Sequence, residues 1–183
     1  LASVLLTVEP PPEEGTLDVL AVQGNAVRQW ELEERESDPP LRITTALRDE
    51  TLAAIERDGP PDLTVWPESS VDRDPFAPRG APLAELAGEA AAASGRLLTG
   101  ASLDGPDPPT QRLIAALLLE DGFNEIDRYV KRRLVPFGEF IPFRTLLEWY
   151  PPLDQIPRDA QPAVAPQSLE VVAAEGRLIG VRR

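Results

Sequence analysis

The 183-residue sequence contains no cysteine and no histidine. Without cysteine, disulfide scaffolds, cysteine-rich zinc sites and, within these residues, any thiol nucleophile are excluded. Without histidine, the chain has no imidazole base and lacks the commonest metal ligand. Histidine-dependent catalytic triads are therefore excluded, and acid–base chemistry in this chain must use other side chains.

Methionine is also absent, and lysine is almost absent. Because the chain begins Leu1-Ala2-Ser3 and lacks methionine, we expect it to be a piece of a longer protein. Lys131 is the only lysine among 18 basic residues. Arginine stays protonated and rigid, whereas a lysine amine is compact and its pKa is tunable. Lys131 is therefore a candidate for a chemical role, and a surface lysine without function is the alternative.

Basic residues are scarce relative to acidic ones, at 18 against 31, which gives a net charge of −13. Nucleic-acid-binding proteins gather lysine and arginine against phosphates, so this charge argues against a nucleic-acid partner. No apolar run reaches the ~18 residues that a membrane span requires. Residues 1–8 are too short for a signal peptide, and the proline-rich stretch 10–15 is typical of a linker. We therefore expect a tail over 1–15 and a domain over 16–183.

The remaining composition, 42% apolar and 27% charged, is typical of a globular domain. Apolar runs and turn signals predict strands over 17–22, 63–66, 96–101 and 113–119, with a closing hairpin over 169–173 and 177–181. Helical spacing predicts helices over 41–57, 82–94 and 142–150. This order predicts a layered α/β domain. The long loops 23–41 and 151–168 are candidates for function.

Glu68 follows the predicted strand 63–66 directly, and Pro67 fixes the direction in which the chain leaves that strand. Ligand sites of α/β proteins lie outside the carboxyl ends of strands, so Glu68 is a candidate site residue. A solvated loop glutamate is the alternative. Lys131 lies beside other basic residues and ahead of a Pro-Phe-Gly turn with Glu139. Flanking apolar residues predict partial burial, so Lys131 and Glu139 need polar partners.

Four motifs occur in an order that is similar to that of a known family: VQGN at 22–25, VWPES at 65–69, YVK at 129–131 and LVPFGEFIP at 134–142. Together they resemble the carbon–nitrogen hydrolase (nitrilase-like) domain of apolipoprotein N-acyltransferases, over about 16–181. The resemblance implies an α/β fold, a nitrilase-like α-β-β-α layered sandwich that is incomplete at its C-terminus. It also implies no cofactor and no metal.

The resemblance assigns a role to each of three residues. Glu68 would be the general base, Lys131 would stabilise the tetrahedral oxyanion, and Glu139 would be an additional essential acid. We expect Glu68 to be partly buried and its carboxylate to lie within roughly 3–5 Å of the Lys131 amine, as paired catalytic groups require. Glu139 is expected to border the same pocket from the other side.

The resemblance also implies a reaction and a location. A cysteine thiol takes an acyl chain from a phospholipid, and the N-terminal amine of a diacylglyceryl apolipoprotein then attacks the thioester. The domain would lie at the membrane surface, on the extracytoplasmic face of the cell membrane. The family's cysteine follows the stretch that corresponds to 176–181, where this chain reads Arg182-Arg183. We therefore expect a truncated domain, inactive alone, that lacks the nucleophile and a preceding membrane part.

Two alternatives remain open at this point. One is a soluble amidase of the same superfamily, which shares the glutamate, the lysine and the cysteine. The other is a non-catalytic fragment that only folds or binds. A further question concerns the large apolar residues of the predicted helix, which lie mostly on one face: Phe140, Phe143, Leu146, Leu147 and Tyr150. Core packing is the commoner explanation, and an amphipathic arm at a membrane surface is the alternative.

Overall fold

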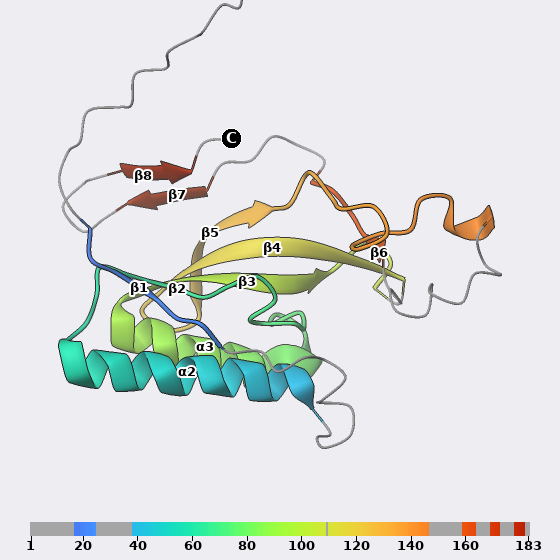
Figure 1. Cartoon of the computed structure of the whole chain (residues 1–183). Coiled ribbons are helices and arrows are strands. Elements are labelled where there is room, and N and C mark those ends of the chain that lie inside the picture. The colour runs from blue at the N-terminus through green and yellow to red at the C-terminus, as the bar shows by residue number, and fades with distance from the viewer. Residues whose placement is uncertain are drawn as a thin grey trace, which may run out of the picture.

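The computed structural model describes residues 17–24, 38–108, 110–146, 159–163, 169–172 and 178–181. They form a six-stranded sheet with two α-helices against one face, and a separate two-stranded sheet (Figure 1). The layered α/β class predicted from the sequence is therefore confirmed. The predicted tail over 1–15 lies outside the described residues, as do large parts of the two long loops.

The main sheet joins a parallel half to an antiparallel half. Its strands are β1 (Val19–Ala21), β2 (Leu63–Val65), β3 (Arg96–Asp104), β4 (Gln111–Glu120), β5 (Asn124–Val130) and β6 (Asp159–Ala160). The order is β1-β2-β3-β4-β5, and β6 pairs with β4. β1, β2 and β3 run parallel, whereas β4 runs antiparallel to both β3 and β5. The carboxyl ends of β2 and β5 therefore lie at the same edge of the sheet, although β3 and β4 separate these strands.

Two helices supply the crossovers that parallel strands require. They are α2 (Pro39–Asp58) and α3 (Ala81–Ser94), the latter preceded by the 3₁₀ turn η1 (Pro78–Gly80). The Asp38 carboxylate accepts a hydrogen bond from the Leu41 amide at 3.2 Å, which caps the first turn of α2. Gly59 and Gly95, with φ of 91° and 77°, end α2 and α3 in a backbone region that favours glycine. The predicted helices 41–57 and 82–94 are confirmed.

Apolar side chains cover both faces of the sheet. On the helical face, the main core includes the fully buried Leu47, Leu97, Leu117 and Leu119. Leu118, which points to the opposite face, is also fully buried, in a second cluster with Leu63. Because consecutive residues of β4 are buried on both faces, the strand reads as an unbroken apolar run, and this is why it could be predicted from the sequence.

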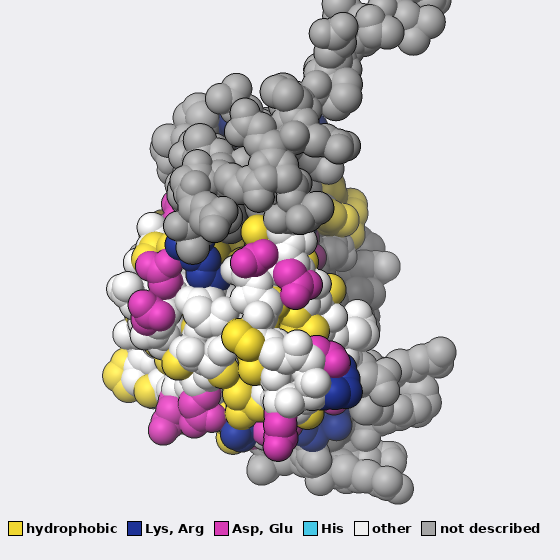
Figure 2. All heavy atoms as spheres, turned by 90° about the vertical axis from the view of Figure 1, so that its left-hand side faces the viewer, with side chains coloured by type: hydrophobic (Ala, Val, Ile, Leu, Met, Phe, Trp, Pro, Cys, Tyr) yellow, Lys and Arg dark blue, Asp and Glu magenta, His cyan; other side chains and the backbone are white. Residues whose placement is uncertain are grey.

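The chain is acidic, with a net charge of −13. Figure 2 shows Asp and Glu side chains spread among neutral, apolar and a few basic side chains on the face at the left of Figure 1. Ion pairs join some of these groups, and one of them links α2 to α3 through Arg48 and Glu89 at 3.2 Å. In the part of the chain that the structure describes, no helix is both long enough and apolar enough to cross a membrane.

Two strand features differ in how far the sequence predicted them. The closing hairpin is confirmed as β7 (Leu169–Val172) paired antiparallel with β8 (Leu178–Val181), and β7 contacts β5 (Figure 1).

Strand β5 was not predicted from the sequence. Its sequence, NEIDRYV, carries four charged or amide side chains, so it shows no apolar run. Pairing with β4 defines this strand, and a long-range pairing leaves no local signal in the sequence.

The predicted helix over 142–150 is wrong at its start. Phe143 has a φ of +54°, and this left-handed conformation interrupts a right-handed helix that begins at Pro142. Within 142–146, the described part of this prediction, the helical element is the 3₁₀ turn η2 (Arg144–Leu146). Residues 147–150 lie outside the described residues. Phe143 and Leu146 are 78% and 72% exposed, so the core-packing interpretation is wrong for both.

Candidate active site

The turn that carries Glu68 is fastened to the edge of β3. The Trp66 amide donates to the Leu98 carbonyl at 2.8 Å, so β2 remains paired up to the last residue before the turn. The Gly100 amide donates to Pro67, and the Gly100 carbonyl accepts from Val71, at 3.3 and 3.0 Å. Glu68 is therefore held between two attachments to one strand.

Gly100 permits this close approach. A Cβ atom at this position would lie 2.6 Å from Glu68 Cα and 2.8 Å from the Pro67 carbonyl oxygen, both backbone atoms. Any larger residue at this position would push the Glu68 turn away from β3. An isolated glycine inside an apolar strand is a known sign of close backbone approach, so this signal was present in the sequence and was missed.

Helix α2 holds the same turn from the core side. Trp66 is 2% exposed, and its indole N–H donates to Thr51 Oγ1 on α2 at 2.9 Å. Thr44 Oγ1, also on α2, donates to the Ser70 carbonyl at 2.7 Å. Both contacts are buried, so the position of Glu68 depends on the packing of α2 against the sheet.

Lys131 is the first residue after β5. Its amide donates to the Ile114 carbonyl of β4 at 2.8 Å, and its carbonyl accepts from Ala163 at 3.2 Å. Since β5 and β2 end at the same edge of the sheet, the Lys131 side chain can reach the Glu68 turn. The strand order thus explains how residues 63 positions apart come together.

Glu139 lies in the Pro-Phe-Gly turn that follows. The amide of Glu139 donates to the Val135 carbonyl at 2.9 Å, and the Val135 amide donates back to Glu139 Oε2 at 2.8 Å. Phe137, with a φ of +61°, occupies the left-handed position of this turn. The carboxylate is therefore oriented by its own turn before it meets any other side chain.

The ammonium group of Lys131 lies between the two carboxylates. Its Nζ donates to Glu68 Oε1 at 3.1 Å and also to Glu139 Oε1. The predicted proximity of Glu68 and Lys131 is confirmed, and Glu139 approaches the same ammonium from another segment. These contacts test the geometry of the three residues, whereas their catalytic roles stay predictions.

Exposure differs among the three side chains: Glu68 is 60% exposed, Lys131 28% and Glu139 14%. The expected partial burial of Glu68 is therefore wrong among the described residues. The backbone of the Glu68 turn packs against Gly100, and the described residues leave most of the Glu68 side chain uncovered. Lys131 is its charged partner in the structure.

The three charges shift the titration of Lys131 and Glu139 in opposite directions. Burial favours the neutral amine, but hydrogen bonds to Glu139 and Glu68 outweigh it, so the pKa of Lys131 is raised above 10.5. Burial also favours the neutral carboxyl, yet the Lys131 ammonium and the Val135 amide outweigh it and lower the pKa of Glu139 below 4.5. At neutral pH the site thus holds the Lys131 ammonium against the ionised Glu139. Such a group can meet negative charge that develops in a transition state.

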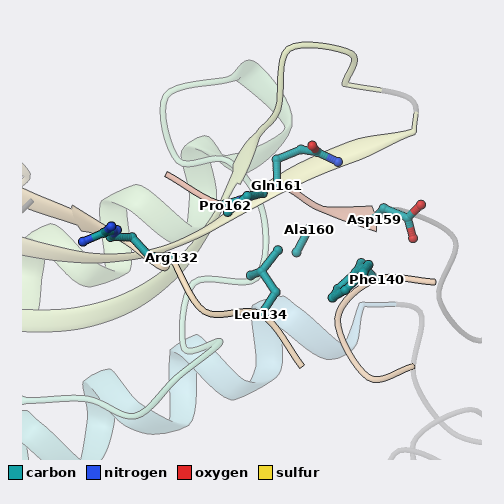
Figure 3. A pocket seen from close by; sticks show the side chains of 7 residues that line it. All are labelled: Arg132, Leu134, Phe140, Asp159, Ala160, Gln161 and Pro162. Atoms are coloured by element: carbon teal, nitrogen blue, oxygen red, sulfur yellow. The ribbon is translucent and has the colours of Figure 1, made fainter. Parts of the chain in front are cut away.

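A hollow of about 320 Å³ adjoins this cluster. It is lined by the residues that follow Lys131 and Glu139 in sequence and by the β6 segment: Arg132, Leu134, Phe140, Asp159, Ala160, Gln161 and Pro162 (Figure 3). None of the three charged residues lines it. We place the candidate site at the charged cluster, because the groups with chemical capacity converge there.

Comparison with known proteins identifies the fold. No family model matches the sequence. A solved structure of the amidase from Nesterenkonia sp. AN1, with acrylamide added to its active-site cysteine, aligns with a TM-score of 0.54 and 18% identity over 90% of this chain and 56% of the amidase. An N-terminal amidase with a Gln-Gly peptide aligns with a TM-score of 0.51 and 14% identity over 85% of this chain and 33% of that one.

The similar structures share one fold class. The class is the nitrilase-like fold, since another structure of the Nesterenkonia enzyme, described as a nitrilase-superfamily amidase, aligns equally well at a TM-score of 0.54. The particular neighbours are amidases, and at 14–18% identity they establish the fold alone. This chain spans about half of the Nesterenkonia amidase and a third of the N-terminal amidase.

Proposed function

We propose that this chain is part of the catalytic domain of an apolipoprotein N-acyltransferase, with Glu68 as general base, Lys131 as oxyanion stabiliser and Glu139 as the acid that holds Lys131. The observation that carries the proposal is the Lys131 ammonium held between Glu68 and Glu139. The nucleophile would be a cysteine outside these 183 residues, which contain none.

In the proposed reaction Glu68 takes the proton of the cysteine thiol, and the thiolate attacks the ester carbonyl of a phospholipid. Lys131 stabilises the oxyanion that forms. The C–O bond then breaks, and the departing alcohol takes the proton from Glu68, which leaves a thioester and a lysophospholipid. The N-terminal amine of a diacylglyceryl apolipoprotein attacks the thioester, the C–S bond breaks, and the amine proton returns to the thiolate through Glu68.

Exposed apolar side chains beside Glu139 support a membrane surface as the place of this reaction. Val135, Phe137, Phe143 and Leu146 are 54%, 62%, 78% and 72% exposed and lie within twelve residues of one another in the chain. We propose that this apolar arm, residues 135–146, contacts the lipid that supplies the acyl chain. The cell membrane, with the domain on its extracytoplasmic face, is the location that this function requires.

A soluble amidase is the second candidate, and the shared fold of the amidase neighbours supports it as much as the acyltransferase. The two functions share the charged cluster and differ in both substrates. The acyl donor is a phospholipid ester or a small amide, and the acceptor is a lipoprotein amine or water. For the chain alone, without a thiol, we expect neither thioester formation nor turnover.

The test begins with the coding sequence on both sides of this chain. The proposal requires an in-frame cysteine shortly after Arg183 and hydrophobic segments before Leu1. The full-length protein is then assayed with a phospholipid and a diacylglyceryl lipopeptide, and mass spectrometry follows the acyl thioester. Glu68→Gln is expected to abolish the thioester, whereas Glu85→Gln, which changes an exposed acid on α3, leaves it unchanged. Hydrolysis of small amides without acyl transfer would establish the amidase instead.

A further inference from the structure

The carboxylate of Asp159 joins the chain just after Glu139 to the start of β6. Arg144 Nε donates to Asp159 Oδ2 at 2.8 Å, and Arg144 Nη2 donates to Oδ1 at 2.6 Å. The Ile141 amide donates to the same Oδ1 at 3.0 Å. Three hydrogen bonds thus tie the chain just after Glu139 to the first residue of β6.

The short segment 159–163 in turn contacts the backbone of the charged cluster. The Ala160 amide donates to the Glu139 carbonyl at 2.8 Å, and the Ala163 amide donates to the Lys131 carbonyl at 3.2 Å. Between them, the backbone amide of Gln161 donates to the Arg112 carbonyl of β4 at 2.8 Å. One five-residue segment therefore holds the backbones of Lys131 and Glu139 against the sheet.

We infer that Asp159 is a positioning residue: through Arg144 and Ile141 it fixes the Glu139 turn on β6 and thereby sets the contact between Glu139 and the Lys131 ammonium. For its catalytic meaning this inference rests on the proposed function, but the contact itself is measurable without turnover. Figure 3 shows Asp159 beside Ala160 and Phe140 at one end of the hollow, with its carboxylate directed away from Leu134.

The ion pair between Arg144 and Asp159 can hold the Glu139 turn in one orientation. The Arg144 and Asp159 side chains are 30% and 21% exposed, so solvent screens them only in part. A forked arginine–carboxylate contact also specifies orientation, which a single hydrogen bond does not. The Arg144 guanidinium lowers the pKa of Asp159, so the anchor stays ionised at neutral pH. Asparagine at this position would keep the size and lose the charge-assisted fork.

The test uses the full 183-residue chain and its single lysine. Limiting acetic anhydride modifies free amines, and peptide mass spectrometry separates acetylation at Lys131 from acetylation at the N-terminal amine. The pH profile of Lys131 acetylation is measured for the wild type, Asp159→Asn, Arg144→Lys and Glu139→Gln. Glu120→Gln is the matched control, because it breaks a comparable ion pair, Arg96–Glu120 at 2.9 Å, that lies between β3 and β4.

We expect Asp159→Asn to move the profile to lower pH and to raise the acetylation rate at about pH 9 by about threefold, in the same direction as Glu139→Gln, because the amine loses its strongest carboxylate partner. Arg144→Lys should fall between these variants and the wild type, and Glu120→Gln should match the wild type. If Asp159→Asn does not fold, the pH profile of Lys131 acetylation in Arg144→Lys tests the inference instead. A wild-type profile in Asp159→Asn or Arg144→Lys, beside a shifted one in Glu139→Gln, would overturn the inference. An unshifted Glu139→Gln would instead remove the support for the proposed function.

Discussion

At the residue scale, the candidate site consists of one cation between two acids on separate turns. Glu68 and Lys131 were identified from the sequence because their motifs are local, a proline and an acid after a strand and a single lysine before a Pro-Phe-Gly turn. Asp159 could not be predicted in this way. Its partners are 15 and 18 residues away, and an Asp in a proline-rich segment shows no sign of them.

The position of Glu68 depends on the absence of a side chain at residue 100. We predict that Gly100→Ala lowers the free energy of unfolding by about 1–3 kcal/mol, because the new methyl group meets the backbone of Glu68 and Pro67. It should also lower the pKa of Lys131, since the displaced Glu68 no longer accepts its hydrogen bond. Denaturant unfolding and a Lys131 titration measure the two effects. Wild-type values in both would show that the turn does not press on β3.

The depressed pKa of Glu139 predicts a pH dependence with a definite sign. A carboxylate whose pKa is lower in the folded chain stabilises the fold above its unfolded value, here about 4.5, and loses that effect as the pH falls through the folded value. Wild type should therefore be more stable than Glu139→Gln at neutral pH, and the difference should shrink below about pH 4.5. Urea unfolding across this range tests it, and a difference that stays constant with pH would contradict the assignment.

At the element scale, the sequence predicted the long helices and the apolar strands and missed elements that exist only through pairing. β5 has a polar sequence, and β6 is two residues long, so both are defined by their hydrogen bonds to β4. The helix predicted from Pro142 is interrupted by the left-handed conformation of Phe143. Tertiary contacts decided these cases against local propensity.

Helix α2 is capped at its N-terminus by Asp38, and Arg73 holds the Asp38 side chain in place. Asp38 caps the first turn and also pairs with Arg73 through both carboxylate oxygens, at 2.6 and 2.8 Å. We predict that Asp38→Ala lowers the free energy of unfolding by about 1–2 kcal/mol. Asp58→Ala, at the other end of the helix, should have little effect, because an acid there opposes the helix dipole. Equal losses in the two variants would contradict a capping role for Asp38.

The apolar arm 135–146 is expected to bind lipid. Phe143→Ser with Leu146→Ser should reduce binding of the chain to phosphatidylcholine vesicles by about tenfold, because two large exposed apolar side chains are removed. Ile126→Thr is the control, since Ile126 is 45% exposed on β5. Zwitterionic vesicles are used because a chain of net charge −13 is repelled by anionic lipid. Cosedimentation gives the binding, and equal binding by all variants would remove the arm from the proposal.

At the scale of the whole molecule, the sheet order brings the site together. β2 and β5 end at one edge with β3 and β4 between them, and the core beneath is built by α2 and α3. The layered α/β class followed from the alternation of apolar runs and helices in the sequence. The exposure of Glu68 could not be predicted from the sequence. It depends on which other segments cover the turn, and the local strand motif carries no information about those segments.

The measurement that tests the central claim most directly is the titration of the Lys131 amine in the intact chain. Chains labelled with ¹⁵N-lysine give a single side-chain signal, since Lys131 is the only lysine. The account predicts a pKa above 10.5 in the wild type, a lower value in Glu68→Gln and in Glu139→Gln, and no change in Glu120→Gln. A wild-type pKa at or below 10.5 that neither Glu68→Gln nor Glu139→Gln moves would contradict it.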